Sequence, residues 1–205
     1  MNTNNRIYLA SRSPRRRELL QQIGIAFEAL LLREDLRRGA DVDETLIPGE
    51  SPESYVSRVA RAKAEAGWHR IASRRLLPRP VLAADTAVVL DGEIIGKPAD
   101  ARRAHELLRR LSGRTHHVLT AVAVAREARV ETALSISAVE FRELADGEIR
   151  LYVASGEPLD KAGAYAIQGR AAVFVRAISG SYSGIMGLPL FETAELLGRF
   201  GVAPD

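Results

Sequence analysis

The 205-residue sequence predicts an α/β fold, a single domain over residues 1–205 with a twisted, mixed β-sheet flanked by helices. Two observations lead to this prediction. Apolar runs of strand length alternate with stretches of helical period along the chain, and no repeat, low-complexity segment or linker divides it. The dipeptide Asp91-Gly92 joins two apolar runs in the manner of a hairpin turn, so part of the sheet must be antiparallel.

Two helix starts are predicted in the first half of the chain. Ser13 and Pro14 predict the start of a helix over residues 14–23, and Pro52 lies in the first turn of a helix over residues 51–69. The elements around these helices are expected as strands at residues 6–10, 27–32 and 81–90 and as a polar loop at residues 33–50.

The second half of the chain begins with the hairpin and ends with a helix. The turn at Asp91-Gly92 leads into a short strand at residues 93–96. Two long neighbouring strands, separated by a turn near residues 126–128, form the centre of this half. The expected elements are helices at residues 99–111, 145–155 and 188–200, strands at residues 116–125, 129–143 and 171–178, and a Gly/Ser loop before the last helix.

The composition narrows the functional classes. Hydrophobic residues make up 46% of the chain and charged residues 27%, as in ordinary globular proteins. The absence of cysteine excludes disulfides, zinc–thiolate sites and a thiol nucleophile. No apolar run approaches the roughly 18 residues of a membrane span, and the polar start has no apolar leader segment, so we expect a cytoplasmic protein without a membrane partner. The net charge of +3 comes from arginines mixed with acidic residues, so no nucleic-acid polymer is expected as a partner.

The stretch LASRSPRRRELL, residues 9–20, predicts an anion site. Free backbone N–H groups at the helix entrance and the positive end of the helix dipole attract anions, and Arg15 and Arg16 add their side chains. Arg16 also shares the helical phase of Leu19 and Ile23, which turns it inward. A solvated basic helix cap is the alternative.

A single carboxylate interrupts the apolar strand VLAADTAVVL. Asp85 in a buried strand must be protonated or paired, so a cationic partner is expected. Lys63 lies on the apolar stripe of its helix, where it either snorkels to the surface or points into a cleft. The turn at residues 91–92 sets Thr86 opposite Lys97, so Asp85, Thr86 and Lys97 are expected to meet at one strand end. They would form a site for a metal or an activated water, or a structural ion pair.

Three further segments offer polar groups. Gln168, in PLDKAGAYAIQGR, carries the donors and the acceptor that reading a nucleobase edge requires, although a surface amide has the same signature. The glycines of SGSYSGIMGLPL form either a phosphate or base loop or a flexible turn. The acidic residues 41–44 can contribute to a magnesium or manganese site or belong to an ordinary solvated loop. The sequence assigns no role to Lys161.

Five motif regions occur in one characteristic order and spacing. They are LASRSPRRRELL, DVDET, ESPESYVSRVARAKA, AADTAVVLDGEIIGKP, and LDKAGAYAIQG followed by SGSYSGIMGLPL. Together they resemble the Maf family of nucleoside triphosphate pyrophosphatases, over residues 8–197, and imply the Maf/ITPase-like fold. Ala166, Gly184 and Met186 depart from the residues usual in the family, and none of them removes a group that the chemistry needs.

The resemblance implies a reaction and the roles of its residues. The reaction is hydrolysis of dTTP, UTP or modified pyrimidine nucleoside triphosphates between the α and β phosphates, to the monophosphate and pyrophosphate. The implied catalytic residues are Asp85 and Lys97, the substrate-binding residues Ser11, Arg15, Arg16, Lys63, Thr86 and Gln168, and the ligands of a Mg²⁺ or Mn²⁺ ion Glu44 and Asp85. Arg15, Thr86 and Gln168 match the pyrimidine branch of the family. The alternatives are a 7-methyl-GTP pyrophosphatase and a non-catalytic regulator of septum formation, and the family suggests a homodimer.

Overall fold

The computed structural model describes residues 6–33 and 39–204. The strands are β1 (Arg6–Leu9), β2 (Ala26–Ala29), β3 (Val81–Leu90), β4 (Glu93–Ile95), β5 (Thr115–Arg126), β6 (Arg129–Phe141) and β7 (Val175–Ser179). The helices are α1 (Pro14–Gln22), α2 (Pro52–Ser73), α3 (Ala101–Leu111), α4 (Asp146–Ala154), α5 (Tyr182–Met186) and α6 (Leu190–Gly198). Residues 34–38 of the expected polar loop lie outside the described residues, as do residues 1–5 and 205.

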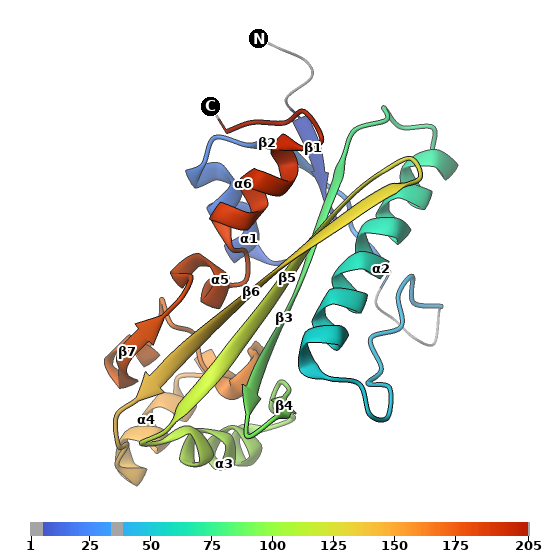
Figure 1. Cartoon of the computed structure of the whole chain (residues 1–205). Helices are drawn as coiled ribbons and strands as arrows, with labels where there is room; N and C mark the ends of the chain where they lie inside the picture. The colour runs from blue at the N-terminus through green and yellow to red at the C-terminus, as the bar shows by residue number, and fades with distance from the viewer. Residues whose placement is uncertain (1–5, 34–38, 205) are drawn as a thin grey trace.

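The seven strands join one mixed sheet in the order β2-β1-β3-β5-β6-β7, with β4 paired to β3 outside this path (Figure 1). The β1–β2 and β1–β3 pairs are parallel, and the β3–β4, β3–β5, β5–β6 and β6–β7 pairs are antiparallel. The predicted α/β class with a mixed sheet is therefore confirmed. The hairpin has the register that its two-residue turn predicts, with Leu90 opposite Glu93 and Val88 opposite Ile95.

Side-chain caps fix the starts of the first helices where the sequence predicts them. The Ser13 hydroxyl accepts the Arg16 backbone N–H at 3.5 Å, and Pro14 begins α1. The Ser51 hydroxyl accepts the Ser54 N–H at 3.3 Å at the start of α2. This helix continues four residues beyond its predicted end, because Ile71 extends its buried stripe by one more turn.

Two predictions for the C-terminal part are wrong. The first half of the expected strand 171–178 is the 3-10 helix Arg170–Phe174, whose period places Ala171 and Phe174 together in the core, whereas a strand would turn them to opposite faces. The Gly/Ser loop contains α5, which the Ser181 hydroxyl caps by accepting the Gly184 N–H at 2.9 Å. The sequence does not indicate this short helix, because glycine has a low helix propensity.

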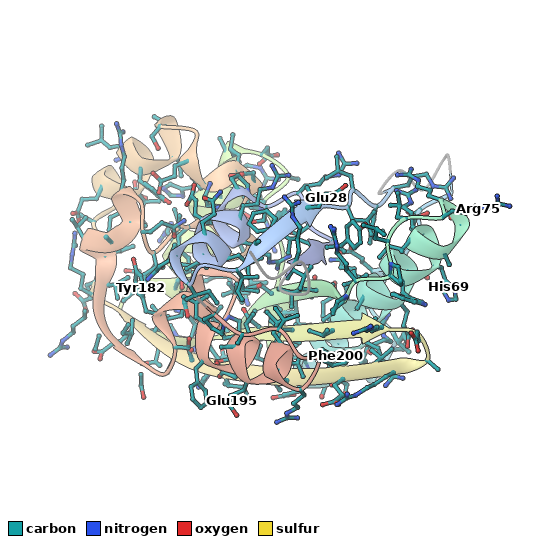
Figure 2. The ribbon with its side chains drawn as sticks, turned by 90° about the horizontal axis from the view of Figure 1, so that it is seen from above. Glu28, His69, Arg75, Tyr182, Glu195 and Phe200 are labelled. Atoms are coloured by element: carbon teal, nitrogen blue, oxygen red, sulfur yellow. The ribbon has the colours of Figure 1, made fainter. Side chains whose placement is uncertain are left out.

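The helices form layers on the two faces of the sheet. α2 covers one face, and α1, α5 and α6 cover the other (Figure 1). Seen from above, α6 lies along the long β5–β6 hairpin, with Glu195 pointing outward (Figure 2). α3 and α4 enclose a third apolar cluster at the far end of β3, β5 and β6. Within the described residues, no helix has the length and apolar character needed to cross a bilayer.

One edge of β3 is left without a described partner strand in its middle. β3 pairs with β1 through Val81 and Leu82, and with β4 from Val88 to Leu90. Between these points, residues 83–87 pair with no described strand on that edge. Asp85 shares its face with the residues that pack under α2, whereas Thr86 shares its face with those under α1. The two neighbouring residues therefore point to opposite faces beside one opening.

A buried histidine lies in an aromatic cluster under α3 and α4. His116 is fully buried, and its Nε2 atom lies 2.8 Å from the Tyr165 hydroxyl. Its ring also packs edge-on against Phe141, with 5.0 Å between ring centroids. Burial, and to a smaller extent the neighbouring His117, lowers the pKa of His116 to about 4.

This burial predicts a loss of stability in acid. An unfolded histidine has a pKa near 6.5, so the unfolded chain binds more protons than the folded chain between about pH 6.5 and pH 4. The stabilisation from neutral His116 is complete above pH 6.5 and is lost as the pH falls through that window. Urea unfolding at pH 7 and pH 5 should show that His116→Gln removes about 2 kcal/mol of the wild-type pH dependence. His117→Gln, at the exposed neighbour, should retain that dependence. An NMR titration midpoint of His116 near 6.5 would contradict the prediction.

Candidate active site

A cavity of about 900 Å³ opens at the unpaired stretch of β3. Its walls come from the loop before α1, the segment before α2, α2 itself, the β3–β4 hairpin, the loop around residues 160–168 and the end of α5. All nine residues predicted for the site line this one cavity: Ser11, Arg15, Arg16, Glu44, Lys63, Asp85, Thr86, Lys97 and Gln168. The chain thus brings together segments as far apart in the sequence as Arg16 and Gly187, which are 171 residues apart.

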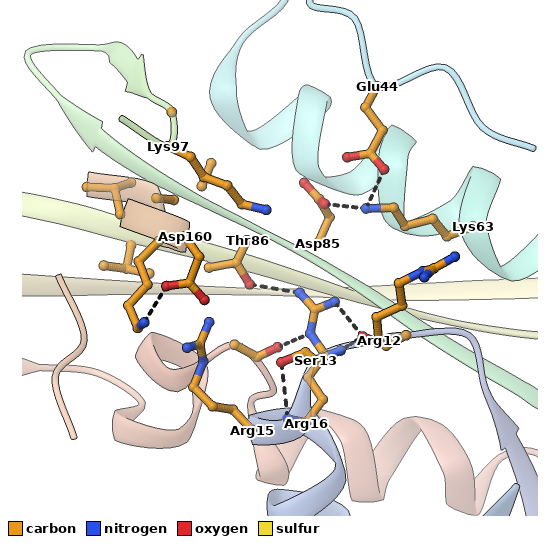
Figure 3. A pocket seen from close by; sticks show the side chains of 18 of the residues that line it. Arg12, Ser13, Arg15, Arg16, Glu44, Lys63, Asp85, Thr86, Lys97 and Asp160 are labelled. Carbon is orange, nitrogen blue, oxygen red and sulfur yellow. Dashed lines mark hydrogen bonds and ion pairs between the residues drawn. The ribbon is translucent and has the colours of Figure 1, made fainter. Parts of the chain in front are cut away.

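On the α2 side of the cavity, a lysine bridges two carboxylates. Lys63 Nζ lies 2.8 Å from Asp85 Oδ1 and 3.0 Å from Glu44 Oε1 (Figure 3). Asp85 is only 8% exposed, so its charge depends on this partner. Of the two alternatives for Lys63, the cleft is the one observed, since its helical phase directs the ammonium group to Asp85.

On the α1 side, Arg16 is fixed from three directions. Its Nε donates to the Gly187 carbonyl at 2.8 Å, its Nη1 to the Ser11 hydroxyl at 3.3 Å and its Nη2 to the Thr86 hydroxyl at 3.2 Å (Figure 3). Gly187 has a φ of 113°, a left-handed conformation that ends α5 and that L side chains rarely adopt. Burial lowers the pKa of Arg16, and the charge of Asp85 opposes this shift, so the guanidinium stays charged.

Lys97, Arg15 and Gln168 approach the cavity without a side-chain hydrogen bond to any described residue. Within the described part of the chain, the side chain of Lys97 makes no hydrogen bond or ion pair, and those of Arg15 and Gln168 make no hydrogen bond. Gln168 is exposed at the rim, and Arg15 lies near Asp160 (Figure 3). These groups are therefore available to a ligand.

One geometric prediction for the site is wrong. The β3–β4 ladder ends at the Val88–Ile95 pair, so Lys97 does not lie opposite Thr86 in a strand pair. Thr86 pairs instead with Thr120 of β5. The site also lies at the middle of β3 and not at a strand end, because the register of β5 extends along nearly all of β3. Lys97 reaches the same cavity from beyond the end of β4 (Figure 3).

The segment that carries Glu44 is clamped to α2 through three consecutive backbone carbonyls. Arg58 donates to the carbonyls of Asp43 at 3.3 Å and Thr45 at 3.0 Å, and the Tyr55 hydroxyl donates to that of Glu44 at 3.2 Å. Glu50 holds the Arg58 guanidinium in two hydrogen bonds of 2.6 and 2.8 Å. Burial, then the charges of Asp85 and Glu44, raises the pKa of Tyr55 to about 12, so the hydroxyl keeps its proton at neutral pH.

Several residues in or beside the site have no local signal that would place them there. Tyr55 and Arg58 look like ordinary residues of an amphipathic helix, and Asp160 like a polar loop residue. Thr120 is a buried hydroxyl in an apolar strand, the same signal that marked Asp85, but its partner depends on the β3–β5 register. Lys161, which the sequence left without a role, pairs with Asp160 at 2.5 Å and donates to the Glu157 carbonyl at 2.8 Å.

The carboxylates of the site fit a metal only in part. No cluster of three or more His, Asp or Glu residues able to hold an ion occurs within residues 6–33 and 39–204. Glu44 and Asp85, however, each lie within 3.0 Å of one cationic atom, Lys63 Nζ. Two such carboxylates suit a Mg²⁺-type ion that takes its other oxygen ligands from substrate phosphates and water.

The family model and the similar curated proteins indicate one family. The family model described as "Maf-like protein" matches residues 6–200. A dTTP/UTP pyrophosphatase of Dechloromonas aromatica is 58% identical over 97% of this chain and 99% of its own length. A dTTP/UTP pyrophosphatase of Aromatoleum aromaticum is 62% identical over 96% of both chains. The solved Ham1 protein of Staphylococcus aureus covers 95% of this chain and 97% of its own, with 18% identity and a TM-score of 0.48.

The carbonyl clamp predicts a local effect of one substitution. Arg58→Lys removes the planar fork that holds two carbonyls and Glu50 together, so the segment carrying Glu44 should loosen. Amide hydrogen exchange at residues 43–47 should accelerate about threefold to tenfold, as expected for the loss of roughly 1 kcal/mol of hydrogen bonding. Arg61→Lys is the control, because Arg61 lies on the same helix and, among the described residues, forms an ion pair only with Glu65 at 2.9 Å. Equal exchange in the two variants would refute the clamp.

Proposed function

The chain belongs to the family of Maf-like proteins, and on this premise we propose that it hydrolyses pyrimidine nucleoside triphosphates such as dTTP and UTP. The bond broken is the one between the α and β phosphates, and the products are the monophosphate and pyrophosphate. The observation that carries the proposal is the buried Asp85–Lys63 ion pair in a cavity whose described lining carries more cationic side chains than carboxylates. Relatives of 58% and 62% identity that carry the dTTP/UTP pyrophosphatase name support the choice of substrate.

The charge of the cavity suits a triphosphate. Among the described residues its lining includes seven cationic side chains and four carboxylates. The cations are Arg12, Arg15, Arg16, Arg33, Lys63, Lys97 and Lys161, and the carboxylates are Asp43, Glu44, Asp85 and Asp160. This excess of positive charge favours a polyanion, and a cavity of about 900 Å³ is large enough for a nucleotide.

Asp85 is the group proposed to act on water. Lys63 binds its Oδ1 atom, which leaves Oδ2 to accept a proton from a water beside the phosphates. As the water oxygen bonds to phosphorus, the proton passes to Asp85, the bridging P–O bond breaks, and pyrophosphate leaves with the bond's electron pair. The pairing with Lys63 keeps Asp85 oriented before the reaction.

The cations are proposed to stabilise the charge that develops on the phosphate oxygens. Arg16 is held rigid by its three protein acceptors, and Ser11 and Thr86 supply two of them. Arg15 lies beside it at the α1 entrance, where the helix dipole also favours anions. Lys63 and Lys97 approach from the other side, so the triphosphate would lie between the lysines and the arginines.

Glu44 and Asp85 are the residues proposed to hold a divalent metal ion, Mg²⁺ or Mn²⁺. Such an ion would neutralise phosphate charge when it is bound with the nucleotide. Before binding, Lys63 fills the place between the two carboxylates, and the clamp on the backbone around Glu44 keeps that carboxylate in reach.

The rim of the cavity is proposed to recognise the base. Gln168 presents an amide with a donor and an acceptor, which matches the alternating carbonyl and N–H groups of uracil and thymine. Arg15 and Thr86 complete the set that the family resemblance assigns to substrate choice. From the same resemblance we infer a homodimer and a cytoplasmic site of action.

A nucleotide panel tests the proposed function. With Mg²⁺ or Mn²⁺ present, dTTP and UTP should give the monophosphate and pyrophosphate with a kcat/KM at least tenfold above those of 7-methyl-GTP and ATP, because base hydrogen bonds discriminate strongly. Chromatography of the products identifies the bond that breaks. Formation of diphosphate and inorganic phosphate would exclude α–β cleavage, and preference for 7-methyl-GTP would assign the chain to the other branch.

Removal of the proposed base tests the mechanism. Asp85→Asn should lower kcat for dTTP by about 10²–10⁴-fold, the range for loss of a general base, while nucleotide binding persists through the cations. Asp91→Asn is the matched control, because Asp91 lies on the same hairpin, its side chain is 64% exposed, and its one ion pair within the described part of the chain is with Arg114. If Asp85→Asn released pyrophosphate at the wild-type rate, Asp85 would not be the base.

A further inference from the structure

A chain of hydrogen bonds links Arg16 to the inside of the molecule. Arg16 Nη2 donates to the Thr86 hydroxyl at 3.2 Å. The hydroxyls of Thr86 and Thr120 are 3.0 Å apart, and the Thr120 hydroxyl lies 2.8 Å from the Gly184 carbonyl. Thr120 is fully buried and is the direct cross-strand neighbour of Thr86 on the α1 face of the sheet.

The chemistry of the four groups fixes which group donates and which accepts along this series of hydrogen bonds. A carbonyl oxygen can only accept and a guanidinium can only donate, so the two ends of the chain are fixed. Thr120 has one hydroxyl proton, and the Gly184 carbonyl takes it at the shorter distance. With this assignment of the Thr120 proton, Thr86 donates its own proton to Thr120, which leaves its lone pairs to accept from Arg16. Thr86 therefore offers a ligand a lone pair and no proton.

Helix α5 and its C-terminal cap anchor Arg16 through two backbone carbonyls. The Gly187 carbonyl accepts directly from Arg16 Nε at 2.8 Å, and the Gly184 carbonyl ends the chain through the two threonines. With Ser11 as the third acceptor, three of the five N–H groups of the guanidinium are bound by described residues. The other two N–H groups suit bidentate contact with phosphate oxygens.

We propose that Thr120 is a positioning residue for Arg16, although it does not line the cavity. It accepts from Thr86 and donates to Gly184, and so holds the Thr86 lone pair toward the Arg16 guanidinium. Without the Thr120 hydroxyl, the Thr86 proton loses its acceptor, and the buried Gly184 carbonyl keeps only the Gly187 backbone N–H, at 2.9 Å, as a donor. Thr86 would then turn, and Arg16 would lose one of its three anchors. The inference rests on the proposed function, in which Arg16 binds phosphate.

The test measures the affinity for inorganic pyrophosphate by calorimetry, which needs no hydrolysis. Thr120→Val keeps the shape and the strand preference of the side chain, and should weaken pyrophosphate binding about tenfold by loosening a charge-assisted contact. Thr120→Ser keeps the hydroxyl and should restore wild-type affinity. Thr115→Val makes the same change at an exposed position of β5 and should have no effect.

A double-mutant cycle distinguishes positioning from a purely structural role. If Thr120 acts through Thr86, Thr120→Val should add no loss of affinity in a Thr86→Val background. A structural role would lower the melting temperature and give additive losses. If Thr120→Val does not fold, Thr120→Ala takes its place in the cycle.

The outcomes separate the two proposals. Wild-type affinity in the folded Thr120 variant, or additive losses in the cycle, would overturn the role of Thr120. Absence of pyrophosphate binding by the wild-type chain would overturn it as well, since Arg16 would then bind no phosphate. A wild-type chain that binds pyrophosphate but cleaves no nucleotide would overturn only the proposed function.

Discussion

The site depends on an opening in the edge of one strand. β3 pairs with β1 at its start and with β4 at its end, and the five residues between these points pair with no described strand on that edge. Because neighbouring strand residues face opposite sides, Asp85 enters the opening from the α2 face and Thr86 from the α1 face. A continuous sheet would separate these side chains into two unconnected layers. The opening lets both line one cavity.

A buried carboxylate is stable there only because a cation comes with it. Asp85 is 8% exposed, and removal of an ionised carboxylate from water costs several kcal/mol unless a partner offsets the cost. Lys63 is that partner, and it also pairs with Glu44. The cavity keeps further cations, Arg15 and Lys97, without protein hydrogen bonds among the described residues. An anionic ligand can therefore bind without first breaking the pair that holds Asp85.

The two helices that flank the opening support the site in different ways. α2 supplies Lys63 and, through Tyr55 and Arg58, holds the backbone around Glu44. On the other face, hydroxyl groups of β3 and β5 connect α5 with Arg16. The first support consists of charged groups on one helix and the segment beside it. The second consists of neutral groups on neighbouring strands, so it exists only once the sheet has formed.

The sequence by itself determined the local features. The Ser13-Pro14 helix start, the Asp91-Gly92 hairpin and the place of Lys63 on the apolar stripe of its helix follow from caps, turn chemistry and helical phase, which act over a few residues. The nine expected site residues could also be named, because the family motifs mark them together. Tertiary structure alone decided the opening in β3, the Thr86–Thr120 pair, α5, and the 3-10 helix before β7. These features depend on strand register and on contacts between distant segments, and no local pattern of residues specifies either one.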